Sequence, residues 1–195
     1  MSTPQATSHP TEIELSACFQ KEFHAFGTAW HFEQRALRFG KLIKTLTWFT
    51  FALPIAFGTL VLTFDDPTIG SYARIASGVL GGVAFLWALW ALVANWSDAM
   101  GAAQRSMIEN NRLHEAWKDA KHLKDDAFVA EYNKLQARDI SQVAADMLAG
   151  VKEKEKRRMM RKTLMHYALP CKTCNVKPVS IKSSFFSKCE TCGKC

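Results

Sequence analysis

Two long runs of uncharged residues constrain this chain more than any other feature of its sequence. Residues 45–64 and 75–97 hold no Asp, Glu, Lys, Arg or His, although charged residues make up 22% of the chain. At about 1.5 Å per helical residue, the first run spans about 30 Å, the hydrocarbon thickness of a bilayer. The second run is three residues longer and can span with some tilt. We therefore expect two transmembrane helices rather than two buried helices of a soluble all-α core, which would usually carry a polar stripe.

The distribution of basic residues predicts how such a hairpin is oriented. The connection 65–74 contains Pro67 and Gly70, which favour a tight reversal, and its only basic residue is Arg74. Four Lys or Arg residues lie in 25–44, and 19 of the 25 in the chain follow the second run. Cytoplasmic flanks carry the excess of positive charge, so we expect both termini in the cytoplasm. The polar start of the chain lacks the apolar core of a cleavable signal peptide.

Small residues cluster in the second run, where Gly78 and Gly82 form a GxxxG pattern. Small side chains let two helix backbones approach closely in lipid, where better packing drives association. The cluster is either a face for self-association or for the other helix, or ordinary glycine enrichment of a membrane helix. Its members are Ser77, Gly78, Gly81 and Gly82.

Helices are also expected on both sides of the hairpin. After a disordered segment 1–11, residues 12–40 place Phe19, Phe23, Phe26, Trp30 and Leu37 on one helix face. We favour packing of this face on another protein helix over the lipid interface. Cys18 is expected to be a small buried residue, and His24 and His31 are expected to be packed or solvated rather than metal ligands.

Residues 98–166 are rich in helix-forming residues and predict one long cytoplasmic helix, or two helices broken near 124–126. A basic run lies towards the end of this segment. It can bind anionic lipid, nucleic acid or a protein partner, or it is a solvated helix end. Its basic residues are Lys152, Lys154, Lys156, Arg157, Arg158, Arg161 and Lys162.

Two CxxC pairs near the end of the chain predict a metal site. Cys171 and Cys174 are followed, after 14 residues, by Cys189 and Cys192. Each CxxC turn directs two sulfurs at one centre, and two turns complete the S₄ set of a structural Zn²⁺ site. Residues 167–195 are therefore expected to form a small zinc ribbon with a short hairpin around Val179, Ile181, Phe185 and Phe186. Asn175 and Gly193 follow the pairs and suit a positive-φ position, and Cys195 is an alternative ligand to Cys192.

Two other chemistries remain open for these cysteines. A redox CxxC pair is expected in a βαβ context, which this sequence lacks. An iron–sulfur cluster is the second alternative. Disulfides are disfavoured if the segment is cytosolic, because thiols there stay reduced.

The order of elements in 12–166 resembles the SLATT domain, a two-transmembrane module of bacterial conflict systems. The cysteine tail resembles that of small mobile-element proteins with paired CxxC motifs. The SLATT resemblance implies an effector of anti-phage immunity in the bacterial inner membrane, which oligomerises into a pore when a cytoplasmic partner senses infection. It supplies no catalytic residues.

The function predicted from the sequence is thus a non-enzymatic membrane effector, an all-α membrane protein that forms homo-oligomers. The alternative is a passive membrane tether whose zinc ribbon recruits nucleic acid or a protein. A third class, an enzyme of membrane thiol chemistry, would require Cys189 and Cys192 to cycle. Neither a Ser/His/Asp set nor a paired-carboxylate site can be assembled, and no small-molecule substrate is inferred.

Overall fold

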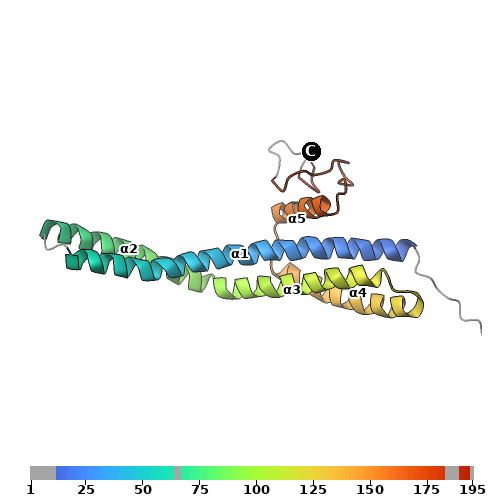
Figure 1. Cartoon of the computed structure of the whole chain (residues 1–195), viewed down its shortest axis with the longest axis horizontal. Helices are drawn as coiled ribbons and strands as arrows, with labels where there is room; N and C mark the ends of the chain where they lie inside the picture. Colours follow the sequence, from blue (N-terminus) through green and yellow to red (C-terminus); the bar gives the residue numbers. More distant parts are fainter. Residues whose placement is uncertain (1–11, 64–66, 183–188, 194–195) are drawn as a thin grey trace, which may run out of the picture. The chain divides into compact units, whose positions relative to one another are not determined.

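The computed structural model describes residues 12–63, 67–182 and 189–193, and every regular element in these ranges is a helix (Figure 1). The expected segment 1–11, the tip 64–66 and Cys195 lie outside the described residues. The five helices are α1 (Glu12–Thr63), α2 (Pro67–Val93), α3 (Trp96–Ala120), α4 (Asp125–Leu148) and α5 (Glu153–His166).

Helix α1 joins two segments that the sequence predicts as separate helices, 12–40 and 45–64. The residues between them, 41–44, contain neither Gly nor Pro, so nothing in the local sequence ends the helix there. The helix also continues through Pro54. Thr50 and Thr59 bond back onto their own helix, because their hydroxyls donate to the carbonyls of Leu46 and Ile55 at 2.9 Å each.

The second half of the chain contains more breaks than the sequence indicates. Helix α2 ends at Val93 because Asn95 adopts a φ of 51°, so the expected span 75–97 does not continue as one helix into α3. A continuous helix over 98–166 is wrong, whereas the alternative with a break near 124–126 is confirmed. A further break, which was not predicted, falls at Gly150, whose φ is 66°.

The chain divides into two compact units. Unit 1 contains Met1–Gln34 and Ala103–Cys195, and unit 2 contains Arg35–Ala102. The cysteine pairs therefore belong to the same unit as α4, α5 and most of α3.

The core of unit 1 lies on the face of α1 that carries Cys18 and Ala25, and not on the predicted aromatic face. This face presents small side chains, Cys18 and Ala25, to large ones on α3 and α4. Small residues on one helix allow close packing of bulky residues on its neighbours. The members of this core are Cys18, Ala25, Leu113, Trp117, Ala120, Phe128 and Leu135.

Helix α5 lies across α1 from α3 (Figure 1), and aromatic residues of α1 pack on its end, although Phe26 also contacts His114 of α3, with ring centroids 5.5 Å apart. Phe26 stacks on His166 with ring centroids 4.0 Å apart, and the Phe23 and Tyr167 centroids are 5.6 Å apart. The prediction that this face packs on a protein helix is confirmed for Phe23 and Phe26. Leu37 does not join the contact, since it belongs to unit 2 and 52% of it is exposed.

Gly27 sets how closely α1 and α5 approach each other. A Cβ atom at this position would lie 2.5 Å from the Thr163 Oγ1 atom, closer than van der Waals contact allows. The Thr163 hydroxyl donates to the Met159 carbonyl within α5, at 2.9 Å. A larger residue here would require the Thr163 side chain to leave its hydrogen bond or the two helices to move apart.

Cys18, His24 and His31 of α1 differ in their burial. Cys18 is fully buried, and burial raises the pKa of its thiol. His31 is buried beside the Phe32 ring, with centroids 5.3 Å apart, whereas His24 is exposed. Neither histidine belongs to a cluster of metal-ligating residues in the described part of the chain.

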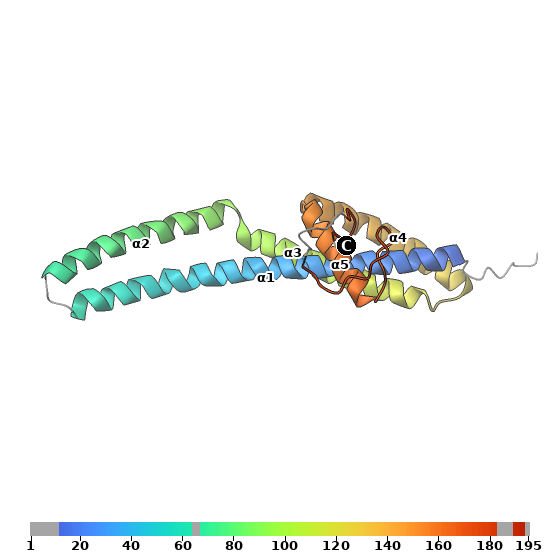
Figure 2. The same cartoon turned by 90° about the horizontal axis from the view of Figure 1, so that it is seen from above.

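Unit 2 consists mainly of two antiparallel helices, the second part of α1 and α2 (Figure 2). The Phe49 and Trp87 rings approach to 6.3 Å between centroids. Between the helices lies an open hollow of about 310 Å³, which Ser77 and Gly81 of α2 line together with Pro54 of α1.

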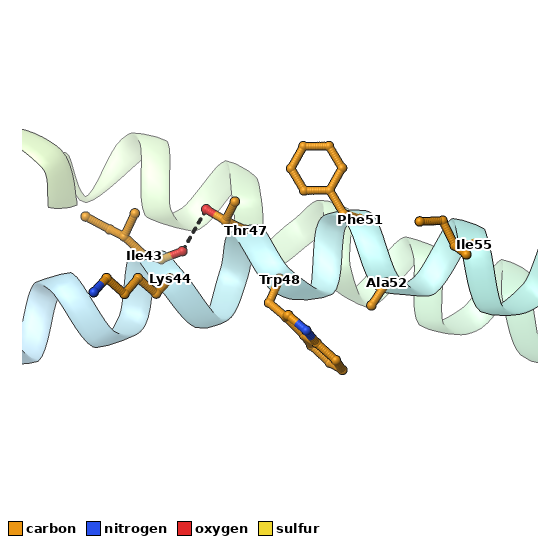
Figure 3. A pocket seen from close by; sticks show the side chains of 7 residues that line it. All are labelled: Ile43, Lys44, Thr47, Trp48, Phe51, Ala52 and Ile55. Atoms are coloured by element: carbon orange, nitrogen blue, oxygen red, sulfur yellow. Dashed lines mark hydrogen bonds between the residues drawn. The ribbon is translucent and has the colours of Figure 1, made fainter.

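The outer surface of unit 2 is apolar. An open hollow of about 590 Å³ lies along α1, and its lining residues, from Ile43 to Ile55, all belong to this helix. Figure 3 shows these side chains. Trp48 and Phe51 in this lining are 65% and 66% exposed. Within the described residues, the stretch Gly70–Val93 of α2 is long and apolar enough to cross a bilayer, and none of its most apolar part is buried. Membrane insertion of both expected spans, 45–64 and 75–97, remains a prediction.

A candidate four-cysteine metal centre

The first CxxC turn is closed by backbone hydrogen bonds. The Asn175 amide donates to the Cys171 carbonyl at 2.7 Å, and the Cys171 amide donates to the Val176 carbonyl at 3.0 Å. Asn175 takes a φ of 55°, which asparagine tolerates better than most residues. The turn therefore directs the sulfur atoms of Cys171 and Cys174 towards one centre, as the sequence predicts.

The second turn repeats the first. The Gly193 amide donates to the Cys189 carbonyl at 2.9 Å, and Gly193 has a φ of 65°. The residues before the second cysteine of each pair also meet, since the Thr173 and Thr191 hydroxyl oxygens are 2.7 Å apart. The predicted positive φ is thus confirmed in both turns.

The two turns bring four sulfur atoms to one point. The ligand atoms of Cys171, Cys174, Cys189 and Cys192 all lie within 4.8 Å of one another. The Cys171–Cys189 and Cys174–Cys192 Sγ distances are 3.9 and 3.6 Å. A tetrahedral site with metal–sulfur bonds of about 2.3 Å has sulfurs about 3.8 Å apart, whereas a disulfide bond is about 2.05 Å long. The four cysteines can therefore hold a metal ion, and these sulfur pairs are not disulfides.

The turns also prepare a thiolate. The backbone amide of Cys192 donates to the Cys189 sulfur and, with the Cys192 thiol, the Thr191 amide and the Cys174 thiol, lowers the pKa of Cys189 to about 6. Metal ions bind cysteine as the thiolate, so a lowered pKa reduces the competition between protons and metal at neutral pH.

No strand accompanies the cysteines in the described residues 167–182 and 189–193, so the zinc ribbon expected from the sequence is corrected there to a pair of CxxC turns. Pro178, which is buried, cannot donate to a strand ladder. Phe185 and Phe186 of the expected hairpin lie outside the described residues.

Instead of a hairpin, the helical unit supports the cysteines. Cys171, Cys189 and Cys192 form a buried cluster with Leu164 of α5, and Phe23 of α1 packs against it. At the end of α5, the Tyr167 hydroxyl donates to the buried Glu22 carboxylate at 3.0 Å. Burial, with this hydrogen bond, raises the pKa of Tyr167, so the phenol keeps its proton.

Arg161 has a role that its place in the basic run did not suggest. Its side chain is only 3% exposed, its Nε donates to the Ile181 carbonyl at 3.0 Å, and its Nη1 donates to the Cys192 carbonyl. A Cβ atom on Gly193 would lie 2.6 Å from this Nη1, so the glycine gives the guanidinium its space. In the sequence, one feature indicates this burial: Arg161 lies three residues before Leu164, and therefore on the same helix face as an apolar residue.

The other basic residues of this run differ in their contacts and in their exposure to solvent. Lys156 pairs with Glu153 at 2.7 Å, and the Lys152 amide is capped by the Glu155 carboxylate at 2.9 Å. The Arg158 guanidinium lies over the Trp30 ring, 5.4 Å from its centroid. Lys154 and Arg157 are exposed, and Lys162 is half-buried.

The small residues of α2 lie beside open space, Gly81 included. Ser77 and Gly81 line the hollow shared with α1. No heavy atom lies within 4 Å of a Cβ position on Gly78 or Gly82, so the GxxxG pair has open space beside it in the described structure.

Comparison with known proteins places this centre in a family. Residues 16–195 match the model of a family described as "Mobilome CxxCx(11)CxxC protein". No curated protein and no solved structure matches the chain. The family description specifies 11 residues between the pairs, whereas this chain has 14, yet its four sulfurs still converge. The chain is therefore a member of the mobilome CxxCx(11)CxxC protein family.

Proposed function

We propose that this protein is a non-enzymatic membrane effector whose α1–α2 hairpin inserts in the bacterial inner membrane, with unit 1 in the cytoplasm. The observation that carries this proposal is the exposure of apolar side chains along α2. Val79, Phe85 and Leu92 are 61%, 63% and 75% exposed. A helix that exposes such side chains and carries no charge after Arg74 is unfavourable in water and favourable in lipid.

Two features favour oligomerisation and a breach of the bilayer. The sequence resembles the SLATT domain, whose proteins are regarded as pore-forming effectors of anti-phage defence. The open space beside Gly78 and Gly82 suits close approach of a second copy. The membership of a mobilome family fits a role in conflict between mobile elements and their hosts.

We also propose that the four cysteines hold a structural Zn²⁺. Four thiolates are a closed ligand set typical of structural zinc. The pKa of Cys189 near 6 makes one thiolate available at neutral pH. The metal would tie the two turns to the helical unit and supply folding energy, without a chemical step.

Dye release from liposomes tests the effector function. Purified full chain should release dye from vesicles of bacterial lipid, and Gly78→Leu should abolish the release by blocking helix approach. Ala76→Leu is the matched control, because it adds the same side chain at an exposed position on another side of α2. Intact vesicles at every protein density would contradict the pore and leave a passive tether.

A further inference from the structure

Four basic side chains line an open hollow of about 480 Å³ beside the metal centre. Lys154, Arg158 and Arg161 follow one another at i, i+4 and i+7 on α5, which places them on one helix face. Lys182 comes from the segment that follows the first CxxC turn, and Ile181 completes the lining. Unit 1 thus gathers cations from two segments at one concave site.

Two of these cations are held in place before any ligand arrives. The Arg158 guanidinium lies over the Trp30 ring, 5.4 Å from the centroid. Arg161 is fixed by its bonds to the Ile181 and Cys192 carbonyls. A guanidinium has five N–H donors, so Arg161 keeps donors beyond these two. Ordered arginines lose less conformational entropy when they bind an anion.

The lining of the hollow carries positive charge that only the neighbouring Cys192 sulfur, beside Arg161, partly offsets in the described residues. No carboxylate is among its lining residues in the described part of the chain. Residues 152–182 contain ten Lys or Arg and only two acidic residues, Glu153 and Glu155. Glu153 pairs with Lys156 at 2.7 Å, and Glu155 caps the start of α5. Like charges brought together in this way repel one another, and a bound anion relieves that repulsion.

We propose that this hollow binds backbone phosphates of nucleic acid. Arginine and lysine are the usual phosphate ligands, and repeated phosphates match several cations at once. The lining offers only Ile181 as an apolar side chain, so it has little surface to hold acyl chains; adsorption to anionic headgroups, which needs charge alone, is an outcome of the test below. The proposal concerns unit 1 and does not depend on pore formation by unit 2.

Binding of a short fluorescent duplex DNA to the full chain tests the site. The protein is held in nanodiscs of neutral phosphatidylcholine, and anisotropy is measured as a function of salt. Lys154→Gln with Lys182→Gln removes two exposed cations of the hollow and leaves the buried Arg161 in place. Lys172→Gln with Lys177→Gln is the matched control, since both lysines are exposed in the same unit and do not line the hollow. Circular dichroism and metal content confirm that both variants fold.

Loss of two phosphate contacts should reduce the slope of log K against log salt by about 1.8, and weaken binding roughly 30-fold near 0.15 M salt. The control should keep nearly the wild-type slope. Equal losses in the two variants would overturn the site in favour of diffuse charge attraction, and absence of DNA binding would overturn it outright. Lys154- and Lys182-dependent binding to phosphatidylglycerol vesicles without DNA binding would assign the hollow to lipid instead. Dye release is measured separately, so failure of the pore leaves this result unaffected.

Discussion

Replacing Arg161 with methionine removes the two hydrogen bonds that tie α5 to the cysteine turns. The change leaves the carbonyls of Ile181 and Cys192 without this donor, while the methionine keeps most of the buried volume. A hydrogen bond that involves a charged group contributes about 1.5–3 kcal/mol. Burial of the guanidinium lowers the pKa of Arg161, which marks a desolvation cost that the substitution relieves. We therefore expect a net loss of about 3 kcal/mol.

Because metal binding and folding of so small a module are linked, this loss should appear as weaker metal binding. About 3 kcal/mol corresponds to roughly a 100-fold loss in affinity. Competition for Zn²⁺ against a chromogenic chelator measures it on the full chain in detergent. Arg161→Lys keeps the charge but not the forked geometry, and should fall between wild type and Arg161→Met.

Arg157→Met is the matched control, because it removes the same charge from an exposed position one turn earlier on α5. It should bind zinc almost as tightly as wild type. The reasoning is refuted if Arg161→Met also binds zinc at the wild-type level, or if both substitutions weaken binding equally, since long-range charge would then explain the effect.

Three further predictions follow from local geometry. Gly27→Ala should destabilise unit 1 by about 1–3 kcal/mol in chemical unfolding, because its Cβ would meet the Thr163 hydroxyl. Adding Thr163→Ala should restore part of this loss, whereas additive effects of the two substitutions would argue against the clash. Ala168→Gly should stabilise the chain by about 1 kcal/mol, since Ala168 has a φ of 56°, and an unchanged melting temperature would count against this strain. The pKa of Cys189 in the folded chain is near 6, below its ordinary value of 9.0. Ionisation of this thiol therefore stabilises the fold at high pH, and this contribution is lost as the pH falls from about 9 to about 6. In the metal-free chain, ultraviolet absorbance of thiolate should therefore show one ionisation near pH 6, whereas a first thiol ionisation near pH 9 would be inconsistent with it.

Local features of the site were predictable from the sequence. The CxxC turns need only a few residues, and the positive φ of Asn175 and Gly193 follows from residue type. The breaks at Asn95 and Gly150 also involve residue types that tolerate a positive φ, but such residues occur within helices too. Their effect depends on tertiary packing, which local propensity does not contain.

Features that join distant segments were not predictable in the same way. The sequence predicts packing on the aromatic face of α1. The core lies instead on the small face around Ala25, because α3 and α4 supply large partners for it. Arg161 belongs by sequence to a basic run, and its bond to Cys192 spans 31 positions. Pairing over such separations cannot be read from helix periodicity.

Membrane insertion of the α1–α2 hairpin is the central claim, and fractionation of cells that express the full chain tests it most directly. After lysis without detergent, the membrane pellet is washed with alkaline carbonate, which strips peripheral proteins. The account predicts that the protein stays in the washed pellet and leaves it only with detergent. Recovery of the protein in the ultracentrifugation supernatant, or its release by carbonate, would contradict the claim.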